Sequence, residues 1–343
     1  MTRIALLGAG RIGRVHARAV GATRGAALVA VADPVAGAAA EVASLHGAEV
    51  RTIDAIEASD DVDAVLVCTP TDTHADLIER FARAGKACFC EKPVDLSMAR
   101  VRACLEVVEA TGTTLMIGFQ RRFDPDFRAL KDVIDTGRIG AVEMVTLTSR
   151  DPGPPPHEYI ARSGGIFRDM TIHDFDVARW LLGEEVESVQ AVGSVLTDPA
   201  IRDLGDFDSA TVLLVTGSGR QCTITNARRA AYGYDQRIEV HGSLGAVSAG
   251  NHRQANIEVA TRDGYSRPPL LDFFMTRYAA AYAAEIAAFA DAVANGAPVP
   301  TTGRDGLMAL ALAEAARRAA GEGRVVPLAE VLDDAGRPAP SIA

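Results

Sequence analysis

Cysteine and positive charge are both scarce in this sequence of 343 residues. Only five cysteines occur, and no two of them form a CxxC pair, so neither a disulfide framework nor a zinc ribbon is indicated. Acidic residues outnumber basic ones by 45 to 35, which gives a formal net charge of −10. Because nucleic-acid binding depends on neutralising phosphates, this charge balance excludes a nucleic-acid partner.

Long apolar runs are also absent. No stretch approaches the roughly 18 uninterrupted apolar residues of a membrane-spanning helix. The apolar start at residues 3–7 is interrupted by Gly8 and Arg11 before it reaches the length of a secretory signal. With so few cysteines, the sequence fits the reducing cytoplasm, and no membrane partner is expected. The 48% of hydrophobic residues suffice for buried cores, and the length favours two domains.

Short apolar runs alternate with helical segments through the first third of the chain. This alternation of predicted strands and helices is typical of an α/β fold with a parallel, doubly wound sheet. We therefore predict a doubly wound domain over residues 1–120. The predicted strands are residues 3–7, 27–32, 63–69, 87–90 and 113–118.

A G-x-G-x-x-G motif at Gly8, Gly10 and Gly13 follows the first predicted strand and opens a predicted helix. In a dinucleotide site the first glycine permits a tight turn, the second lets the backbone approach a pyrophosphate, and the third permits close packing of helix on strand. Asp33, at the end of the second strand, would bind the ribose hydroxyls, and no basic residue directly follows it to receive a 2′-phosphate. We predict NAD as the cofactor. The alternative for the motif is an ordinary glycine-rich turn. The alternative for Asp33 is a helix cap, a role that could coexist with ribose binding.

Three polar clusters follow later strands of the same domain, at residues 69–74, 91–93 and 118–122. The carboxyl ends of parallel strands share one edge of a sheet, where open α/β sheets bind their ligands. Lys92 stands directly after a buried strand, between Glu91 and Pro93. There it would act as a cation that polarises a substrate oxygen.

The pattern changes after about residue 140, where longer strands alternate partially with period two. We predict a second α+β domain over residues 121–330, built on a large, mostly antiparallel, open sheet. Helices are expected at residues 166–182, 276–293 and 303–320, with the C-terminal helix packing back on the first domain, and a loose tail at 331–343. The expected strands are residues 141–148, 186–195, 209–215, 221–225, 236–241 and 255–260.

Asp169 and His173 lie four residues apart on the helix expected at 166–182. This spacing puts two side chains on one helix face, about 5–6 Å apart between Cβ atoms. A carboxylate beside a histidine fixes its tautomer and raises its basicity, as a general base requires. The alternative is a surface ion pair or a core histidine. A metal site with Asp174 and Asp176 matches no zinc signature, so no metal is predicted.

Tyr232, Tyr234 and Asp235 interrupt a strand region, where they would either line a polyol site or pack the sheet. Nearby Arg228 and Arg229 are equally consistent with an exposed surface.

Taken together, these stretches resemble the glucose-fructose oxidoreductase, inositol dehydrogenase and rhizopine catabolism family over nearly the whole chain. The resemblance rests on the glycine motif, Glu91-Lys92-Pro93, and Asp169 with His173, in that order. It is closest to the bacterial inositol-oxidising branch at residues 118–124, 163–174 and 232–237.

The resemblance implies NAD-dependent oxidation of myo-inositol to 2-keto-myo-inositol. Lys92, Asp169 and His173 would form the catalytic triad, with His173 as the general base. Substrate contacts would come from these three residues and from Arg122 and Tyr232, although Tyr234 remains an alternative to Tyr232. The implied cofactor contacts are Gly8, Gly10, Arg11, Ile12, Gly13, Asp33, Thr69, Pro70, Thr71, His74, Glu91, Lys92 and Gln120.

The resemblance further implies a cis peptide bond before Pro93 and assembly through the open sheet face, commonly into a homotetramer. Two other functions stay open. The same chemistry could act on scyllo-inositol, chiro-inositol or an aldose, or the chain could be a non-catalytic NAD(H) sensor on the same fold.

Overall fold

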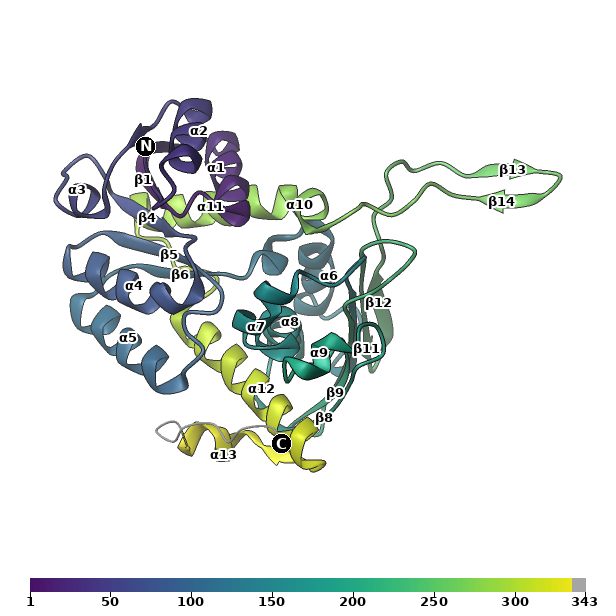
Figure 1. Ribbon diagram of the computed structural model, residues 1–343. Helices are drawn as coiled ribbons and strands as arrows, with labels where there is room; N and C mark the ends of the chain where they lie inside the picture. The colour runs from purple at the N-terminus through teal and green to yellow at the C-terminus, as the bar shows by residue number, and fades with distance from the viewer. Residues whose placement is uncertain (335–343) are drawn as a thin grey trace. The chain divides into compact units, whose positions relative to one another are not determined.

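The computed structural model describes residues 1–334 (Figure 1). The chain divides into two compact units. The first unit comprises Met1–Asp124 and Ala279–Leu310, and the second comprises Pro125–Tyr278 and the chain from Ala311 onward. The segment expected as a tail begins inside helix α13 (Leu328–Asp333), and residues 335–343 of it lie outside the described residues. Within residues 1–334, no helix is both long enough and apolar enough to cross a membrane.

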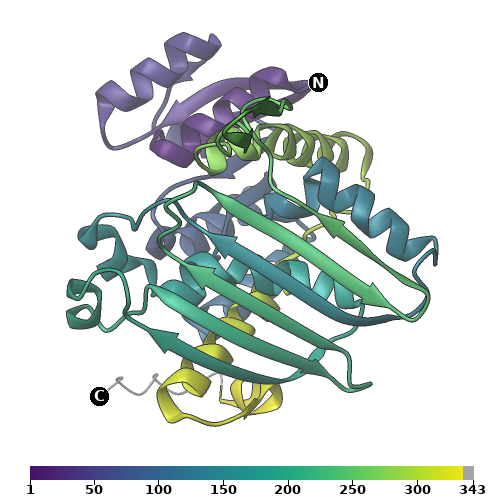
Figure 2. The ribbon, with the colours of Figure 1, turned by 90° about the vertical axis from the view of Figure 1, so that its right-hand side faces the viewer.

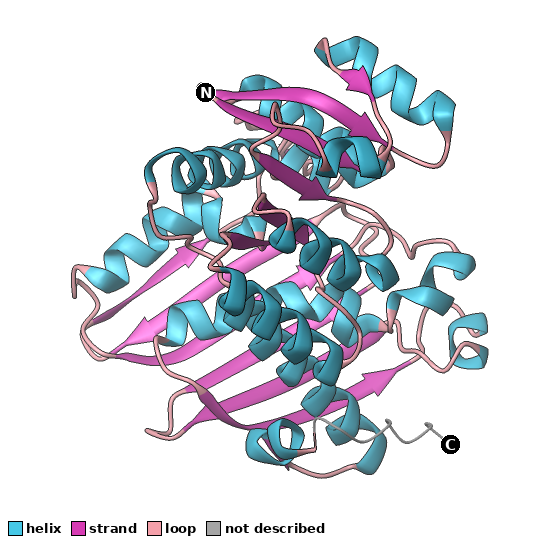
Figure 3. Cartoon of the chain, turned by 90° about the vertical axis from the view of Figure 1, so that its left-hand side faces the viewer, coloured by secondary structure: helices cyan, strands magenta, loops and turns pink. Residues whose placement is uncertain are grey.

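The first unit contains a six-stranded sheet in which every neighbouring pair of strands is parallel (Figure 3). This confirms the predicted doubly wound fold. Strand β1 lies in the middle, and the chain winds outward from it in both directions. In order across the sheet, the strands are β3 (Glu49–Val50), β2 (Ala26–Ala32), β1 (Thr2–Leu7), β4 (Ala64–Val67), β5 (Ala87–Glu91) and β6 (Leu115–Gly118).

Helices connect the strands of this sheet. Helix α5 begins after Ser97, whose hydroxyl accepts the Arg100 N–H at 3.4 Å, as expected for a serine cap. The short β3 and α3 were not predicted, because two exposed residues and a single helical turn carry no periodic pattern. The helices are α1 (Arg11–Ala22), α2 (Ala36–His46), α3 (Ile53–Glu57), α4 (His74–Arg83) and α5 (Met98–Thr111).

A helix from late in the sequence, α11 (Ala279–Asn295), completes the first unit. Its Phe289 ring meets the ring of Phe89 edge to face at 5.7 Å, and the Thr2 hydroxyl donates to the Ala290 carbonyl at 3.2 Å. The chain therefore enters the second unit at Pro125 and returns to the first unit at Ala279. The single helix expected at residues 276–293 is divided at Tyr278, where α10 (Phe274–Arg277) ends and the division between units falls.

The second unit is built on a seven-stranded sheet, shown face-on in Figure 2. All of its neighbouring strands are antiparallel except β7 and β10, so the prediction of a mostly antiparallel sheet is confirmed. The order is β12 (Gly245–Ala249), β11 (Asp235–Gly242), β7 (Val142–Arg150), β10 (Gln221–Ala227), β9 (Ser209–Thr216), β8 (Val186–Ser194) and β15 (Val326–Pro327).

Helix α8 (Ile172–Leu182) packs on strands β7 and β10 of this sheet. The regular helix expected at residues 166–182 begins instead with a π-helical turn, η3 (Phe167–Thr171). The strand expected at 255–260 is wrong over most of its length, because only β13 (Val259–Thr261) forms and pairs with β14 (Gly264–Ser266) in a separate ribbon. The remaining helices are α6 (Pro125–Asp135), α7 (His157–Ser163), α9 (Ala200–Asp203) and the later part of α12 (Gly303–Glu322).

Two glycines set how closely helix α1 approaches strand β1. A Cβ atom added to Gly13 would lie 1.9 Å from the Gly8 carbonyl oxygen. Gly8 itself has a φ of +95°, and a Cβ there would lie 2.5 Å from the Cys68 carbonyl oxygen. Both positions therefore exclude any side chain, which is the task expected for these two glycines of the motif.

We predict that Gly13→Ala lowers the free energy of unfolding by about 2 kcal/mol or more, because the added methyl group overlaps backbone that cannot move aside. Gly37→Ala is the matched control, since an added Cβ there meets nothing within 4 Å. In helix α2 that substitution should be neutral or stabilise by up to about 1 kcal/mol. Urea unfolding followed by circular dichroism measures both, and equal stability of the two variants would contradict the prediction.

Candidate active site

The glycine loop between β1 and α1 has room for a ligand at its middle glycine. A Cβ added to Gly10 meets nothing within 4 Å, in contrast to Gly8 and Gly13. Gly10 is the N-cap of α1, and no side chain caps this helix end. A helix N-terminus without a capping side chain presents backbone N–H groups and a positive dipole to an anion. The residues present here fit a pyrophosphate.

Asp33 connects the glycine loop to the end of strand β2. Its carboxylate accepts the Ala9 N–H at 2.6 Å and the Val35 N–H at 2.7 Å. It does not cap helix α2, because the N-cap of that helix is Val35. The capping alternative is therefore wrong, and the half-buried carboxylate lies beside the loop where ribose binding was predicted.

The loop after β4 is fixed by hydrogen bonds among its own residues. The Thr69 and Thr73 hydroxyl oxygens are 2.6 Å apart, and Thr73 donates to the Pro70 carbonyl at 2.8 Å. His74 is buried, and its two ring nitrogens lie 2.8 Å from the carbonyl oxygens of Thr69 and Pro93. Its side chain therefore ties the loop after β4 to the loop after β5.

Lys92 lies in the loop after β5, which contacts His74 through the Pro93 carbonyl. The peptide bond between Lys92 and Pro93 is cis, which confirms the expectation drawn from the resemblance. The preceding Glu91 is buried, and its carboxylate lies 2.6 Å from His16 Nε2 and accepts the Lys92 N–H at 3.2 Å. Lys92 itself is half-buried. Buried contacts on both sides thus fix the backbone that carries this lysine.

Gln120 and Arg122 lie in a short 3-10 helix, η2 (Gln120–Phe123), after strand β6. Gln120 is buried, and the Arg122 guanidinium donates to Asp305 at 3.0 Å and to the Pro300 carbonyl at 3.2 Å. Burial by itself would raise the pKa of Asp305, but the charge of Arg122 and hydrogen bonds from Thr302 outweigh it and lower that pKa to about 2. Arg122 is therefore anchored to the chain segment that follows α11.

Asp169 lies in the π-helical turn η3 of the second unit. The Tyr159 hydroxyl donates to its Oδ1 at 2.8 Å, and Arg228 Nη1 donates to its Oδ2 at 3.2 Å. Two donors, one of them charged, favour the ionised carboxylate. Single π turns inside helices are rare and occur frequently at functional sites.

His173 follows in the first turn of α8 and is half-buried. The next residue, Asp174, is buried and accepts hydrogen bonds from Ser149 Oγ at 2.6 Å and from Asn226 Nδ2 at 2.8 Å. These bonds join the start of α8 to strands β7 and β10. They fix the rotation of the helix turn that carries His173.

Exposure separates the two candidate tyrosines. Tyr232 is 54% exposed, whereas Tyr234 is 6% exposed and meets the rings of Phe273 and Tyr278 edge to face. The Tyr232 hydroxyl donates to Asp235 at 2.6 Å and accepts from Arg150 at 2.9 Å. Tyr232 is thus the tyrosine that a dissolved ligand can reach, and Tyr234 belongs to the core.

Several residues of these networks were not found from the sequence. No local motif marks these residues. His16 and Asp305 meet Glu91 and Arg122, which are far away in the sequence. Tyr159 lies on a different helix from its partner Asp169. The sequence is equally consistent with an exposed Arg228, but the structure shows that its side chain is 1% exposed. A lone arginine at the end of a strand gives no sign of burial before its acidic partners are known.

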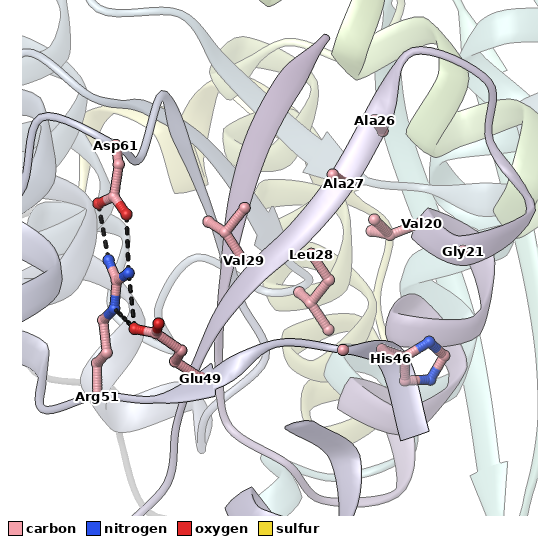
Figure 4. A pocket seen from close by; sticks show the side chains of 11 residues that line it. Val20, Gly21, Ala26, Ala27, Leu28, Val29, His46, Glu49, Arg51 and Asp61 are labelled. Carbon is pink, nitrogen blue, oxygen red and sulfur yellow. Dashed lines mark hydrogen bonds and ion pairs between the residues drawn. The ribbon is translucent and has the colours of Figure 1, made fainter. Parts of the chain in front are cut away.

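The first unit contains a hollow of about 550 Å³ (Figure 4). It is lined by the start of β2 and by His46, and Arg51 pairs there with Glu49 at 2.9 Å and Asp61 at 2.7 Å. The start of β2 is at the opposite end of the sheet from the glycine loop, so this hollow is not the candidate site. Among residues 1–334, no three His, Cys, Asp or Glu side chains are grouped to hold a metal ion.

The parallel sheet, the glycine loop and Asp33 define a dinucleotide-binding protein of the Rossmann class. Residues 2–119 match the model of an oxidoreductase family with an NAD-binding Rossmann fold, and residues 127–248 match the GFO/IDH/MocA C-terminal domain. The chain belongs to the GFO/IDH/MocA family of oxidoreductases, as its sequence resemblance implied. It is an oxidoreductase, and its cofactor is NAD, as predicted.

Similar proteins match over nearly their whole length. An inositol 2-dehydrogenase of Rhizobium meliloti is 65% identical over 327 residues, which are 95% of this chain and 99% of that protein. A myo-inositol 2-dehydrogenase of Thermotoga maritima is 45% identical over 96% of this chain and 99% of its own. The structure of scyllo-inositol dehydrogenase from Lactobacillus casei with bound NAD(H) and scyllo-inositol is 29% identical, with a TM-score of 0.88 and coverage of 96% of this chain and 99% of that one.

We predict that Asp305→Asn lowers stability by about 2 kcal/mol at neutral pH, because the carboxylate partner of Arg122 is lost. A lowered pKa stabilises the folded state fully above the ordinary aspartate pKa, and this stabilisation is lost as pH falls through about 2. The difference between wild type and variant should therefore shrink between about pH 4 and pH 2.

Urea unfolding at a series of pH values tests this expectation. Asp291→Asn is the matched control, since Asp291 is an exposed aspartate on helix α11 of the same unit. A difference between Asp305→Asn and wild type that stays constant down to pH 2 would contradict the assignment.

Proposed function

We propose that this protein is an NAD-dependent inositol dehydrogenase that oxidises one secondary hydroxyl of myo-inositol to the ketone, giving 2-keto-myo-inositol. The observation that carries the proposal is the 65% identity to an inositol 2-dehydrogenase across 95% of the chain. The intact set of Lys92, Asp169 and His173 also supports it, since oxidation of an alcohol requires a general base and stabilisation of an alkoxide-like oxygen.

The cofactor would be held by the glycine loop, by Asp33 and by the loops after the later strands. Gly10 gives the pyrophosphate access to the backbone, and the Asp33 carboxylate receives the ribose hydroxyls. When bound, NAD supplies the nicotinamide ring that accepts a hydride. We assign the remaining contacts to Arg11, Ile12, Thr69, Pro70, Thr71, Glu91, Lys92 and Gln120; for His74 we propose an indirect role, since both ring nitrogens face backbone carbonyl oxygens.

Each catalytic side chain has a separate task in this proposal. His173 takes the hydroxyl proton, while the ionised Asp169 stabilises the imidazolium that forms. Lys92 stabilises the negative charge that develops on the substrate oxygen as the C–H bond breaks. Arg122 and Tyr232 contact the other hydroxyls of the polyol, and the exposure of Tyr232 favours it over Tyr234 for this role.

A second substrate is favoured by one specific comparison. The Lactobacillus casei enzyme that binds scyllo-inositol has a similar structure, so scyllo-inositol is the alternative to myo-inositol. The two isomers differ only in the orientation of one hydroxyl, so a few polar contacts decide between them. A chiro isomer or an aldose would require the same catalytic groups.

We also propose that the protein works in the cytoplasm as a homotetramer. Its five cysteines are buried free thiols, which fits a reducing compartment. The seven-stranded sheet exposes Met144 and Val192 on its strands, which supports assembly through that sheet. Light scattering coupled to size-exclusion chromatography measures the number of subunits.

We predict NADH formation at 340 nm with purified protein, NAD and myo-inositol. The rate with NAD should exceed that with NADP, because Asp33 repels a 2′-phosphate. The substrate panel contains myo-inositol, scyllo-inositol, chiro-inositol and glucose. A preference for scyllo-inositol would reassign the substrate, and NAD binding without turnover on any polyol would favour the sensor function.

We predict that Lys92→Ala and His173→Ala each lower kcat by about a thousandfold, because each removes a group that acts on the reacting atoms. NAD affinity, measured by quenching of protein fluorescence, should stay within a few-fold of wild type. Matched controls are Lys131→Ala, which removes a surface ion pair with Asp135, and His241→Ala, which removes a half-exposed histidine. Near-wild-type turnover in both catalytic variants would contradict the proposed mechanism.

A further inference from the structure

Arg228 is fully buried and lies between two carboxylates. Its Nη1 is 3.2 Å from Asp169 Oδ2, and its Nη2 is 3.4 Å from Asp206 Oδ2. The side chains of Arg228, Asp169 and Asp206 are only 1%, 13% and 6% exposed. Backbone contact also holds the arginine in place, because its N–H donates to the Asp208 carbonyl at 2.7 Å.

Asp206 fixes the chain at the point where the turn that carries Asp169 begins. Its Oδ1 accepts the Ile166 N–H at 2.8 Å, directly before η3. A Cβ added to Gly165 would lie 2.9 Å from the same oxygen, so the backbone is in close contact with this carboxylate. Arg228 therefore reaches Asp169 in two ways: through a direct ion pair, and through Asp206 and the start of η3.

The ionisation of Asp169 and Asp206 depends on the positive charge of Arg228. Burial raises the pKa of Asp206, and the nearby charge of Arg228 opposes that shift. Without the cation, Asp169 and Asp206 would be two carboxylates of 13% and 6% exposure that lie close together, with their negative charges no longer balanced by Arg228. One of them would then hold a proton to higher pH, because two close like charges cannot both ionise readily.

We propose that Arg228 is a positioning residue for the acid–base pair, which keeps Asp169 ionised and oriented so that His173 is an effective base near neutral pH. This inference rests on the proposed function, in which Asp169 supports His173. Arg228 acts through Asp169, and the proposal gives it no contact with substrate or cofactor. Removing it leaves the Asp169–His173 pair holding its proton to higher pH, which withholds the base from the reaction.

Arg228→Met tests this role. We expect kcat for inositol oxidation to fall by about a hundredfold, as for a misplaced catalytic group. The acid limb of the kcat/KM profile should move to higher pH, while NAD affinity stays within about twofold of wild type. Arg228→Lys keeps the charge but loses the two-pronged geometry, so it should restore part of the rate and most of the pH profile. Arg179→Met is the control, because it removes an arginine of the same unit that pairs with Glu185.

The double variant Asp206→Asn/Arg228→Met distinguishes the effect of Arg228 on Asp169 from its effect on Asp206. It removes the cation together with one of its anions, so it avoids two unpaired buried carboxylates and serves if Arg228→Met alone does not fold. The double variant should stay at least about tenfold slower than Asp206→Asn, because Asp169 still lacks its cation. Asp206→Asn alone should keep kcat within about fivefold of wild type, since an amide oxygen still accepts the Ile166 N–H. A double variant as active as Asp206→Asn would overturn the proposal, because Arg228 would then serve only to neutralise Asp206.

A measurement without turnover separates this inference from the proposed function. The imidazole C–H resonance of His173, assigned by its loss in His173→Ala, reports when the pair releases its proton. Its titration midpoint should be higher in Arg228→Met than in wild type, and an unchanged midpoint would overturn the inference. Absence of wild-type turnover on every polyol would contradict the proposed function, but the shift of this midpoint would still decide the role of Arg228.

Discussion

The first unit depends on the contact between helix α1 and strand β1 at two positions without a side chain. Because Gly13 meets the Gly8 carbonyl, α1 starts directly above the end of β1, the strand in the middle of the sheet. The loops that follow β2 and β4, the strands on either side of β1, both contact the glycine loop. Cys68, after β4, packs its carbonyl against Gly8, and Asp33, after β2, bonds the Ala9 N–H. The glycine loop is thus fixed by backbone packing against Cys68 and by a hydrogen bond to the Asp33 carboxylate.

The second unit depends on buried charges that are paired. Asp169 and Asp206 share Arg228, and Glu314 is paired with Arg168 and Arg317. Burial alone would raise the pKa of Glu314, but the two arginines outweigh it and lower that pKa to about 2. An isolated buried charge is too costly to keep, so each of these groups restricts the position of its partner. In the proposed mechanism this restriction matters most at Asp169, because Asp169 is there the partner of the candidate base His173.

The sequence predicted those features that depend on local pattern. Alternating apolar runs predicted the parallel sheet. The motifs at Gly8 and Lys92 predicted polar loops directly after buried strands, and the spacing of Asp169 and His173 predicted that both lie on one helical segment. It did not predict contacts between residues far apart in the chain, such as His16 with Glu91 or Arg228 with Asp206. The π turn at η3 was missed for a related reason, since one extra residue in a helical turn hardly changes the hydrophobic period.

The two units place their candidate catalytic groups by the same physical means. Lys92 and His173 are half-buried, whereas the residues beside them are buried and bonded to distant parts of the chain. Glu91 meets His16 and Pro93 meets His74, while Asp174 meets Asn226. A reacting group must stay accessible, so its own contacts cannot fix it rigidly, and its neighbours carry that task. In the proposed mechanism, the position of each candidate catalytic group therefore depends on the buried residues beside it.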